Sequence, residues 1–225
     1  MAIQNFDEIH ILKRRSIPYK EYFGDMRITP KQKKDREKLA LILEDIFVVY
    51  LALIRNEMET DSLNETYIKQ DMTYSLYDEL ADNDYFDTNQ LDIYVPNLVN
   101  EVYKATVDNL IKYPLDYDYK GETPYWVSED RAKFIAENEA NTICHNKEYL
   151  EAVKSGKTHK IWMAYPDDRV RETHAIVDGA EIPIDAYFDV GAARMLFPKD
   201  LTSELSTGAS FPEEYVNCRC SVKYV

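Results

Sequence analysis

The chain has 225 residues, of which 45% are hydrophobic and 30% are charged, and it contains only six glycines and nine prolines. These values are typical of a globular protein with one large domain or two small ones, and they exclude a low-complexity chain. The formal net charge is −14, yet the first forty residues carry ten Lys or Arg against six Asp or Glu. Their net charge is therefore +4, and residues 41–225 carry −18.

The uneven charge limits where nucleic acid could bind. An acidic body repels phosphate, so any such contact should be confined to a basic N-terminal arm. The cations of this arm are Lys13, Arg14, Arg15, Lys31, Lys33, Lys34 and Arg36. The simpler interpretation of the same charges is a solvated face, and the sequence favours it.

The cysteines and the apolar stretches indicate folding in a reducing cytoplasm. Cys144, Cys218 and Cys220 form an odd set, which is not a secreted disulfide framework. The N-terminus lacks the apolar segment and cleavage site of a signal peptide. The most apolar stretch, residues 39–54, is interrupted by Glu44 and Asp45 and is too short to span a bilayer. We therefore expect no membrane role.

Helical patterns dominate the first half. Thr29 can cap a helix and Pro30 suits its first position. Apolar residues then recur at steps of three and four: Leu39, Ile42, Leu43, Ile46, Tyr50, Leu53 and Ile54. This apolar face is broad, which is typical of a helix central to a bundle or used in assembly. We expect a second helix over residues 65–80 and a third from Pro96 to beyond Leu110.

A change in pattern indicates two domains. Residues 113–125 contain two prolines and one glycine and have no helical period. We predict a helical domain over residues 1–115, a linker over 116–127 and a second domain over 128–225.

The second half is mixed, so the predicted fold class is α+β with a mainly helical N-terminal domain. Ser128 should cap a helix that runs to about Leu150. Residues 160–165 alternate like a strand, and turns are expected at 166–168 and at 178–179. Ile182 and Ile184 indicate a short extended piece. We expect residues 215–224 to form a closing strand with Val216, Cys218, Cys220, Val222 and Tyr224 on one face.

Four stretches in order carry a resemblance to a known family: RAKFIAENEAN, KIWMAYPDDRVRETHAIVDGAEIPIDAYF, FPKD and VNCRC. Over about residues 131–220 the chain resembles the C-terminal domain of the phage Mu F-like head morphogenesis family. It departs from the pattern at Asn138-Glu139, where relatives often have Thr before the acid, and in the long segment before the last strand. The motif positions are Glu139, Trp162, Asp168, Arg169, Arg171, His174, Asp178, Gly179, Asn217, Cys218, Arg219 and Cys220.

The resemblance implies a structural role inside the virion. It implies a minor head protein of few copies, bound near the portal inside the capsid, with roles in assembly and in DNA packaging or ejection. The implied partners are the portal protein, the major capsid protein or both, and packaged DNA could contact the basic arm. No cofactor and no small-molecule substrate are implied.

Glu139 should need a partner. It lies four residues from both Ile135 and Ile143, so on a helix it shares their apolar face. An uncompensated buried carboxylate costs roughly several kcal/mol. We predict a structural clamp between Glu139 and one of three arginines, which are Arg169, Arg171 and Arg219.

Titratable residues concentrate between Asp167 and His174, which is where an acid/base pair would be sought. The alternative function is therefore a phage-borne nuclease or nucleotide-modifying toxin built on Asp168, Arg169, Arg171 and His174. No nucleophile motif or glycine-rich phosphate loop accompanies these residues. The sequence accordingly favours a structural His174 and no enzyme activity. A third class is a DNA-binding ejection protein that works through the basic arm.

His174, Cys218 and Cys220 also suggest a zinc site. On a strand, however, side chains two residues apart are separated by roughly 6.5 Å, which is wide for two thiolates on one ion. A bulge at Arg219 would bring them together. The favoured interpretation is two small buried hydrophobic residues.

Overall fold

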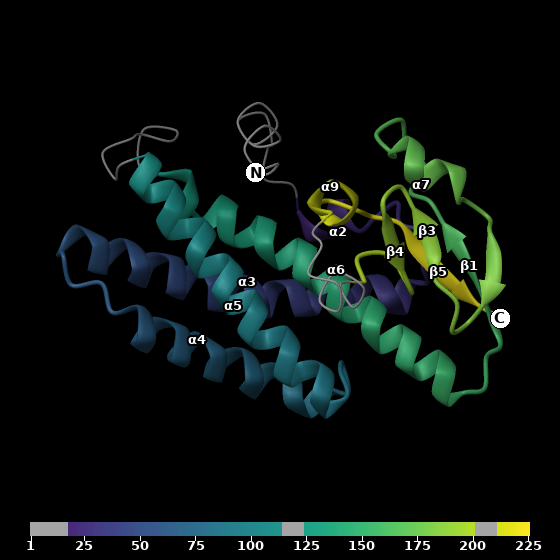
Figure 1. Cartoon of the computed structure of the whole chain (residues 1–225), viewed down its shortest axis with the longest axis horizontal. Helices are drawn as coiled ribbons and strands as arrows, with labels where there is room; N and C mark the ends of the chain where they lie inside the picture. Colours follow the sequence, from purple (N-terminus) through teal and green to yellow (C-terminus); the bar gives the residue numbers. More distant parts are fainter. Residues whose placement is uncertain (1–17, 114–123, 201–210) are drawn as a thin grey trace. The chain divides into compact units, whose positions relative to one another are not determined.

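The computed structural model describes residues 18–113, 124–200 and 211–225. The chain forms two compact units (Figure 1). The helical unit comprises residues 38–147, and the sheet unit comprises residues 148–225 together with the residues before Lys38. The unit boundaries fall inside two long helices. The mixed α+β fold class with a helical N-terminal half is confirmed.

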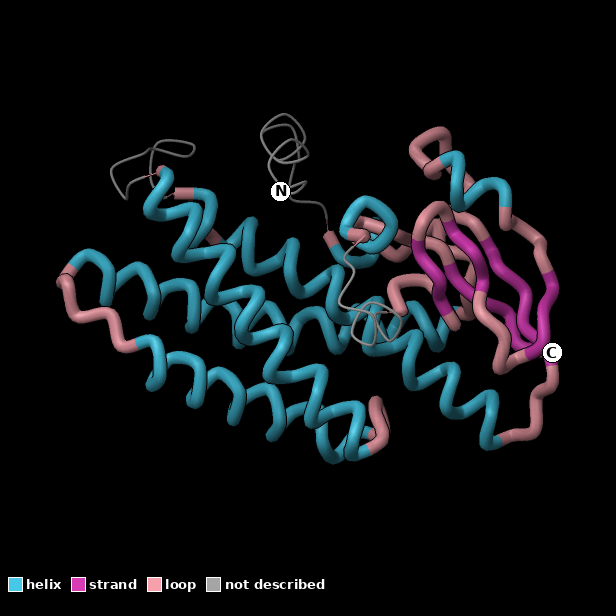
Figure 2. The backbone as a smooth tube through the Cα atoms, viewed as in Figure 1, coloured by secondary structure: helices cyan, strands magenta, loops and turns pink. Residues whose placement is uncertain are grey.

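Helices occupy most of the chain up to residue 154 (Figure 2). They are α2 (Tyr19–Tyr22), α3 (Pro30–Glu59), α4 (Glu65–Leu80), η1 (Ala81–Asn83), α5 (Thr88–Lys112), η2 (Tyr125–Val127) and α6 (Glu129–Lys154). The predicted starts at Pro30 and after Ser128 are confirmed. The Ser128 hydroxyl accepts a hydrogen bond from the Arg131 amide at 3.2 Å, which is the expected cap.

The third predicted helix starts earlier than expected. Pro96 lies inside α5 and does not begin it. The start is set by a capping box, in which the Asp87 carboxylate accepts from the Gln90 amide at 2.8 Å and the Gln90 side chain accepts from the Asp87 amide at 3.3 Å. Pro96 removes one hydrogen bond from the interior of α5, and the helix continues through it to Lys112.

Tyrosine hydroxyls connect successive helices of the helical unit. Tyr50 on α3 donates to Asp71 on α4 at 2.8 Å, and Tyr77 on α4 donates to Asp92 on α5 at 2.9 Å. Between them lies an apolar core. On α4 alone the buried residues are Ile68, Met72, Leu76 and Leu80. The high tyrosine count of the chain thus partly serves packing, because a phenol fills apolar space and still reaches a polar partner.

The sheet unit is built on short antiparallel strands (Figure 2, magenta). Its elements are β1 (His159–Met163), α7 (Glu172–Ile176), β2 (Glu181–Pro183), β3 (Phe188–Val190), β4 (Ala193–Met195), α9 (Pro212–Tyr215) and β5 (Ser221–Tyr224). One sheet has the order β2-β1-β5, and β3 pairs with β4 in a hairpin. Trp162 lies opposite Val222 in the register and is fully buried at the centre of this core.

The closing strand is shorter than predicted. Residues 212–215 form α9, Val216 and Asn217 turn, and the strand begins only at Ser221. Asn217 has a φ of 58°, a left-handed conformation that asparagine tolerates and that ends any extended run. The expectation that Val216, Cys218 and Cys220 share one strand face was therefore wrong.

The compact units do not follow the predicted domains. Most of α6 belongs to the helical unit, and the described residues before Lys38 belong to the sheet unit. The predicted linker over residues 116–127 lies mostly outside the described residues, so the division into 1–115 and 128–225 stays a prediction. Within the described ranges, no helix combines the length and apolar character needed to cross a bilayer.

Candidate functional site

Glu139 has a hydrogen-bond partner within the helical unit. It is half-buried on α6, and it accepts a hydrogen bond from the hydroxyl of Tyr94 on α5. Burial first, and then the charge of Glu139, hold the pKa of Tyr94 well above its usual range. Because the three arginines lie in the sheet unit, the predicted clamp between Glu139 and one of them stays a prediction. A tyrosine 45 residues away carries no sequence signal that marks it as the partner.

Asp167 is the carboxylate that binds the arginines. It accepts from Arg169 Nε at 3.0 Å and from Arg219 at 2.8 Å. The guanidinium carbon of Arg219 also lies 3.7 Å from the centre of the Tyr165 ring. Burial opposes ionisation of Asp167, but the hydrogen bonds from Arg169 and Arg219 outweigh it and lower the pKa. A clamp between a carboxylate and two arginines therefore exists within the sheet unit, with Asp167 as the carboxylate.

Other motif residues fix the backbone around β1. Arg171 donates to the carbonyl of Val216. Asp178 accepts from the Ala164 amide at 2.8 Å and from Arg27 at 2.9 Å. Gly179 has a φ of 77°, which a residue with a Cβ rarely adopts, and its amide donates to the Trp162 carbonyl at 2.8 Å. These residues shape the turn that returns the chain to β2.

The alternative catalytic group is not assembled as one site. Asp168 and Arg169 are exposed and line a surface pocket with Asp25, Tyr165, Pro166 and Asp167. His174 lies 1% exposed in the core. Among the described residues, no hydrogen bond or ion pair joins Asp168 to His174. The sequence cluster thus separates into a solvent-facing part and a buried part.

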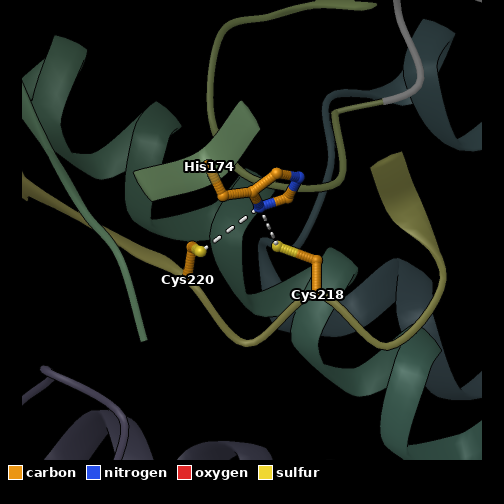
Figure 3. A group of neighbouring side chains, drawn as sticks. All are labelled: His174, Cys218 and Cys220. Atoms are coloured by element: carbon orange, nitrogen blue, oxygen red, sulfur yellow. Dashed lines mark hydrogen bonds between the residues drawn. The ribbon is translucent and has the colours of Figure 1, made fainter. Parts of the chain in front are cut away.

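The buried part is a cluster of His174, Cys218 and Cys220 (Figure 3). His174 comes from α7, and the cysteines come from the segment between α9 and β5. His174 Nδ1 points between the two sulfurs, 3.4 Å from Cys220 Sγ and 3.5 Å from Cys218 Sγ. The two cysteines are each 2% exposed. The three side chains thus converge on one enclosed point.

Four further residues support the ring of His174. Its Nε2 lies 3.0 Å from Glu214 Oε2, which also accepts from the Thr173 hydroxyl at 2.8 Å. Gly191, in the turn between β3 and β4, lies against the same carboxylate: a Cβ there would fall 2.1 Å from Glu214 Oε1. Trp162 packs edge-on against the imidazole, with ring centroids 5.7 Å apart. The orientation of His174 is therefore determined from several sides.

The electrostatics of the cluster favour one shared negative charge. Burial raises the pKa of Cys218, but hydrogen bonds from Cys220 and His174 outweigh it and hold that pKa well below its usual range. The pKa of Cys220 is raised, first by its hydrogen bond with Cys218 and then by burial. Burial lowers the pKa of His174, yet the contact with Cys218 outweighs it and raises the pKa. A thiolate is the form of cysteine that binds metals.

The geometric objection to a metal site rested on an extended strand through both cysteines. Because the chain turns at Asn217 and enters β5 only after Cys220, the cysteines are not held at strand spacing. The ligand atoms of all three residues lie within 4.8 Å of one another. The objection therefore fails, and no bulge at Arg219 is needed.

The sequence matches one family model, described as phage Mu protein F like protein, over residues 101–223. This match covers more than half of the chain. The chain belongs to the phage Mu F-like family. No curated protein and no solved structure matched in the other two comparisons. The family supports a phage head morphogenesis protein and is typically structural.

The phage Mu F-like region includes the whole His174, Cys218 and Cys220 cluster. It also reaches thirty residues further towards the N-terminus than the resemblance seen in the sequence, and so includes part of α5. The sequence analysis named the three clustered residues but missed Glu214 and Gly191. The pattern PEEY gave no reason to select Glu214, because the hydrogen bond to His174 joins residues 40 positions apart.

Proposed function

We propose that this phage Mu F-like protein is a minor head protein that lies inside the capsid beside the portal. There it acts in head assembly and in DNA packaging or ejection. The observation that carries the proposal is the family match over residues 101–223. The partners are the portal protein, the major capsid protein or both.

The helical unit supplies the docking surface in this proposal. Two apolar residues about two turns apart on one side of α3, Leu41 and Val49, are 56% and 60% exposed. Exposed apolar surface of this kind is typical of residues that a partner covers.

In the basic arm, Lys31 and Lys34 are exposed and suit a contact with DNA. Arg36 does not, because it is fully buried against Glu148. The arm's other cations before residue 18 lie outside the described residues.

Incorporation into heads tests the proposal. Heads purified from the phage that encodes the chain should contain it at a few copies per portal, as measured by quantitative mass spectrometry. The double variant Leu41→Ser/Val49→Ser should be soluble but lost from heads, whereas Ile176→Ser should be incorporated normally. Ile176 is a matched control because it is 75% exposed in the sheet unit.

Two outcomes would contradict this function. Absence of the wild-type chain from purified heads would exclude a minor head protein. Normal incorporation of the double variant would show that the docking surface does not include this side of α3.

A further inference from the structure

We propose that His174, Cys218 and Cys220 bind one Zn²⁺ ion in the core of the sheet unit. This inference goes beyond the proposed role in the head, since it concerns what holds the module together. It rests on geometry within one compact unit, and it can be tested on the purified chain.

The distances suit a tetrahedral ion. With Zn–S bonds of about 2.3 Å and Zn–N bonds of about 2.0 Å, tetrahedral angles place a nitrogen and a sulfur ligand roughly 3.5 Å apart and two sulfurs about 3.8 Å apart. The observed separations from His174 Nδ1 are 3.4 Å to Cys220 and 3.5 Å to Cys218. All three ligand atoms lie within 4.8 Å of one another, so a small contraction of the two sulfurs completes the site.

The imidazole is oriented as a ligand. Metal-bound histidines donate their second ring N–H to a carboxylate, which fixes the tautomer and makes the other nitrogen more basic. Glu214 Oε2 lies 3.0 Å from Nε2, so in the zinc-bound form the ring proton would lie on Nε2, and the lone pair of Nδ1, which points between the two sulfurs, would bind the ion. Thr173 and Gly191 hold that carboxylate in place.

The ligand set and its burial select zinc in a structural role. Two thiolates and one imidazole match the ligands that zinc takes in proteins. The cluster is 1–2% exposed, which leaves no path for a substrate. Among the described residues, no fourth His, Cys, Asp or Glu joins the group, so these three residues are the protein ligands that we assign to the ion. The ion would tie α7 to the segment that leads into β5.

The wild-type chain provides the first test. Full-length protein purified with zinc in the medium and dialysed extensively should retain about one zinc per chain by elemental analysis. After removal of zinc, added Co²⁺ should produce the visible absorption of tetrahedral cobalt and the near-ultraviolet bands of cobalt–thiolate bonds. Removal of the metal should also lower the melting temperature, because binding to the folded form alone stabilises it.

The result that overturns the proposal is equally direct. Folded wild-type protein without retained zinc and without cobalt–thiolate bands contradicts it. A mass two units lower, with Cys218 and Cys220 joined in one peptide, would instead show a disulfide and also contradict it.

Matched variants locate the site. Cys218→Ser and His174→Ala should reduce the zinc content to near zero, while Cys144→Ser should leave it at one. Cys144 is the appropriate control because it is also a buried cysteine outside any disulfide, but in the helical unit. Zinc retained by both of the first two variants would contradict the assignment even if the wild type binds zinc.

Two milder variants keep the test valid if the ligand variants do not fold. Glu214→Gln should weaken zinc binding about 10–100-fold, as expected for the partner of a ligating histidine. Gly191→Ala should do the same by displacing Glu214, whereas Gly156→Ala should not. Gly156 shares a positive φ, 76° against 59°, but a Cβ there meets no atom within 4 Å. Equal affinities for these two glycine variants would show that Glu214 does not position His174 for zinc.

Discussion

In the helical unit, α4 buries Ile68, Met72, Leu76 and Leu80 at an even spacing of four residues. In the sheet unit, β1 instead buries Lys160 beside Trp162. Polar contacts in the sheet unit join distant residues: Arg27 and Asp178 are 151 positions apart, and Arg36 and Glu148 are 112 apart. The helical unit therefore buries apolar residues at a regular period, whereas the sheet unit also buries charged groups whose partners lie far along the chain.

The largest effect should follow from breaking one such pair. Arg36 is fully buried and contacts both oxygens of Glu148, at 2.5 and 3.0 Å. Arg36→Ala leaves a carboxylate that is only 13% exposed without this partner. We expect the free energy of unfolding, measured in urea, to fall by about 3–5 kcal/mol.

The matched control is Arg55→Ala in the helical unit. Arg55 pairs with Glu59 one turn away at 2.8 Å, and both side chains are more than one-third exposed. An exposed pair of this kind contributes about 0.5 kcal/mol or less. Replacing both partners of the buried pair, in Arg36→Met/Glu148→Leu, should recover most of the loss. Similar costs for Arg36→Ala and Arg55→Ala would remove the distinction between the units.

A smaller effect, of opposite sign, is expected at Lys160. Its ammonium is fully buried, with ring centroids of Tyr149 and Phe188 at 5.4 Å and no hydrogen-bond partner within the described ranges. Burial lowers its pKa from 10.5 to about 8, although Asp200 and Asp185 partly oppose this. Below pH 8 the group is charged in both states, and the folded state bears the full cost of burying that charge.

The pH dependence follows from the sign of this shift. Between pH 8 and 10.5 the folded chain releases the proton of Lys160 before the unfolded chain does, so stability rises with pH. At pH 7 we expect Lys160→Met to be more stable than wild type by up to about 3 kcal/mol, and this gain should shrink as the pH approaches 10. Lys223→Met, at an exposed position on β5, controls for the loss of a charge. A gain that stays constant from pH 7 to 10 would contradict the assigned pKa.

The helices of the helical unit can be predicted from the sequence better than the contacts of either unit, because helices are encoded locally and contacts between distant segments are not. Residues 65–80 were predicted with both boundaries correct, because a helix is encoded in a repeat that lies within the helix itself. Glu214, Asp167 and Tyr94 were missed as partners, because a hydrogen bond between distant segments leaves no local pattern. The short α9 also went unrecognised, since four residues are too few to show a period.

In the candidate site, the residue types could be predicted from the sequence, but their arrangement could not. His174, Cys218 and Cys220 could be selected by residue type alone, since few side chains bind zinc. Their convergence could not be predicted, because it depends on a left-handed residue at Asn217 within a stretch that alternates like a strand. Alternation describes which residues are buried, but it does not distinguish a strand from a turn that buries the same residues.

The smallest expected effect comes from removing a single methylene group from the core of the helical unit. Ile68 on α4 is fully buried, and Ile68→Val should lower the free energy of unfolding by about 0.5–1.5 kcal/mol. Ile93→Val is the matched control, because Ile93 lies on α5 of the same unit and is 53% exposed. Urea unfolding of both variants should show a loss at Ile68 only. Because Met72 and Leu76 pack on the same side of α4, no single contact of Ile68 should dominate. A loss above that range would mean that the stability of the helical unit also depends on individual positions. The difference between Ile68 and Arg36 would then reflect only the kind of side chain, apolar or charged.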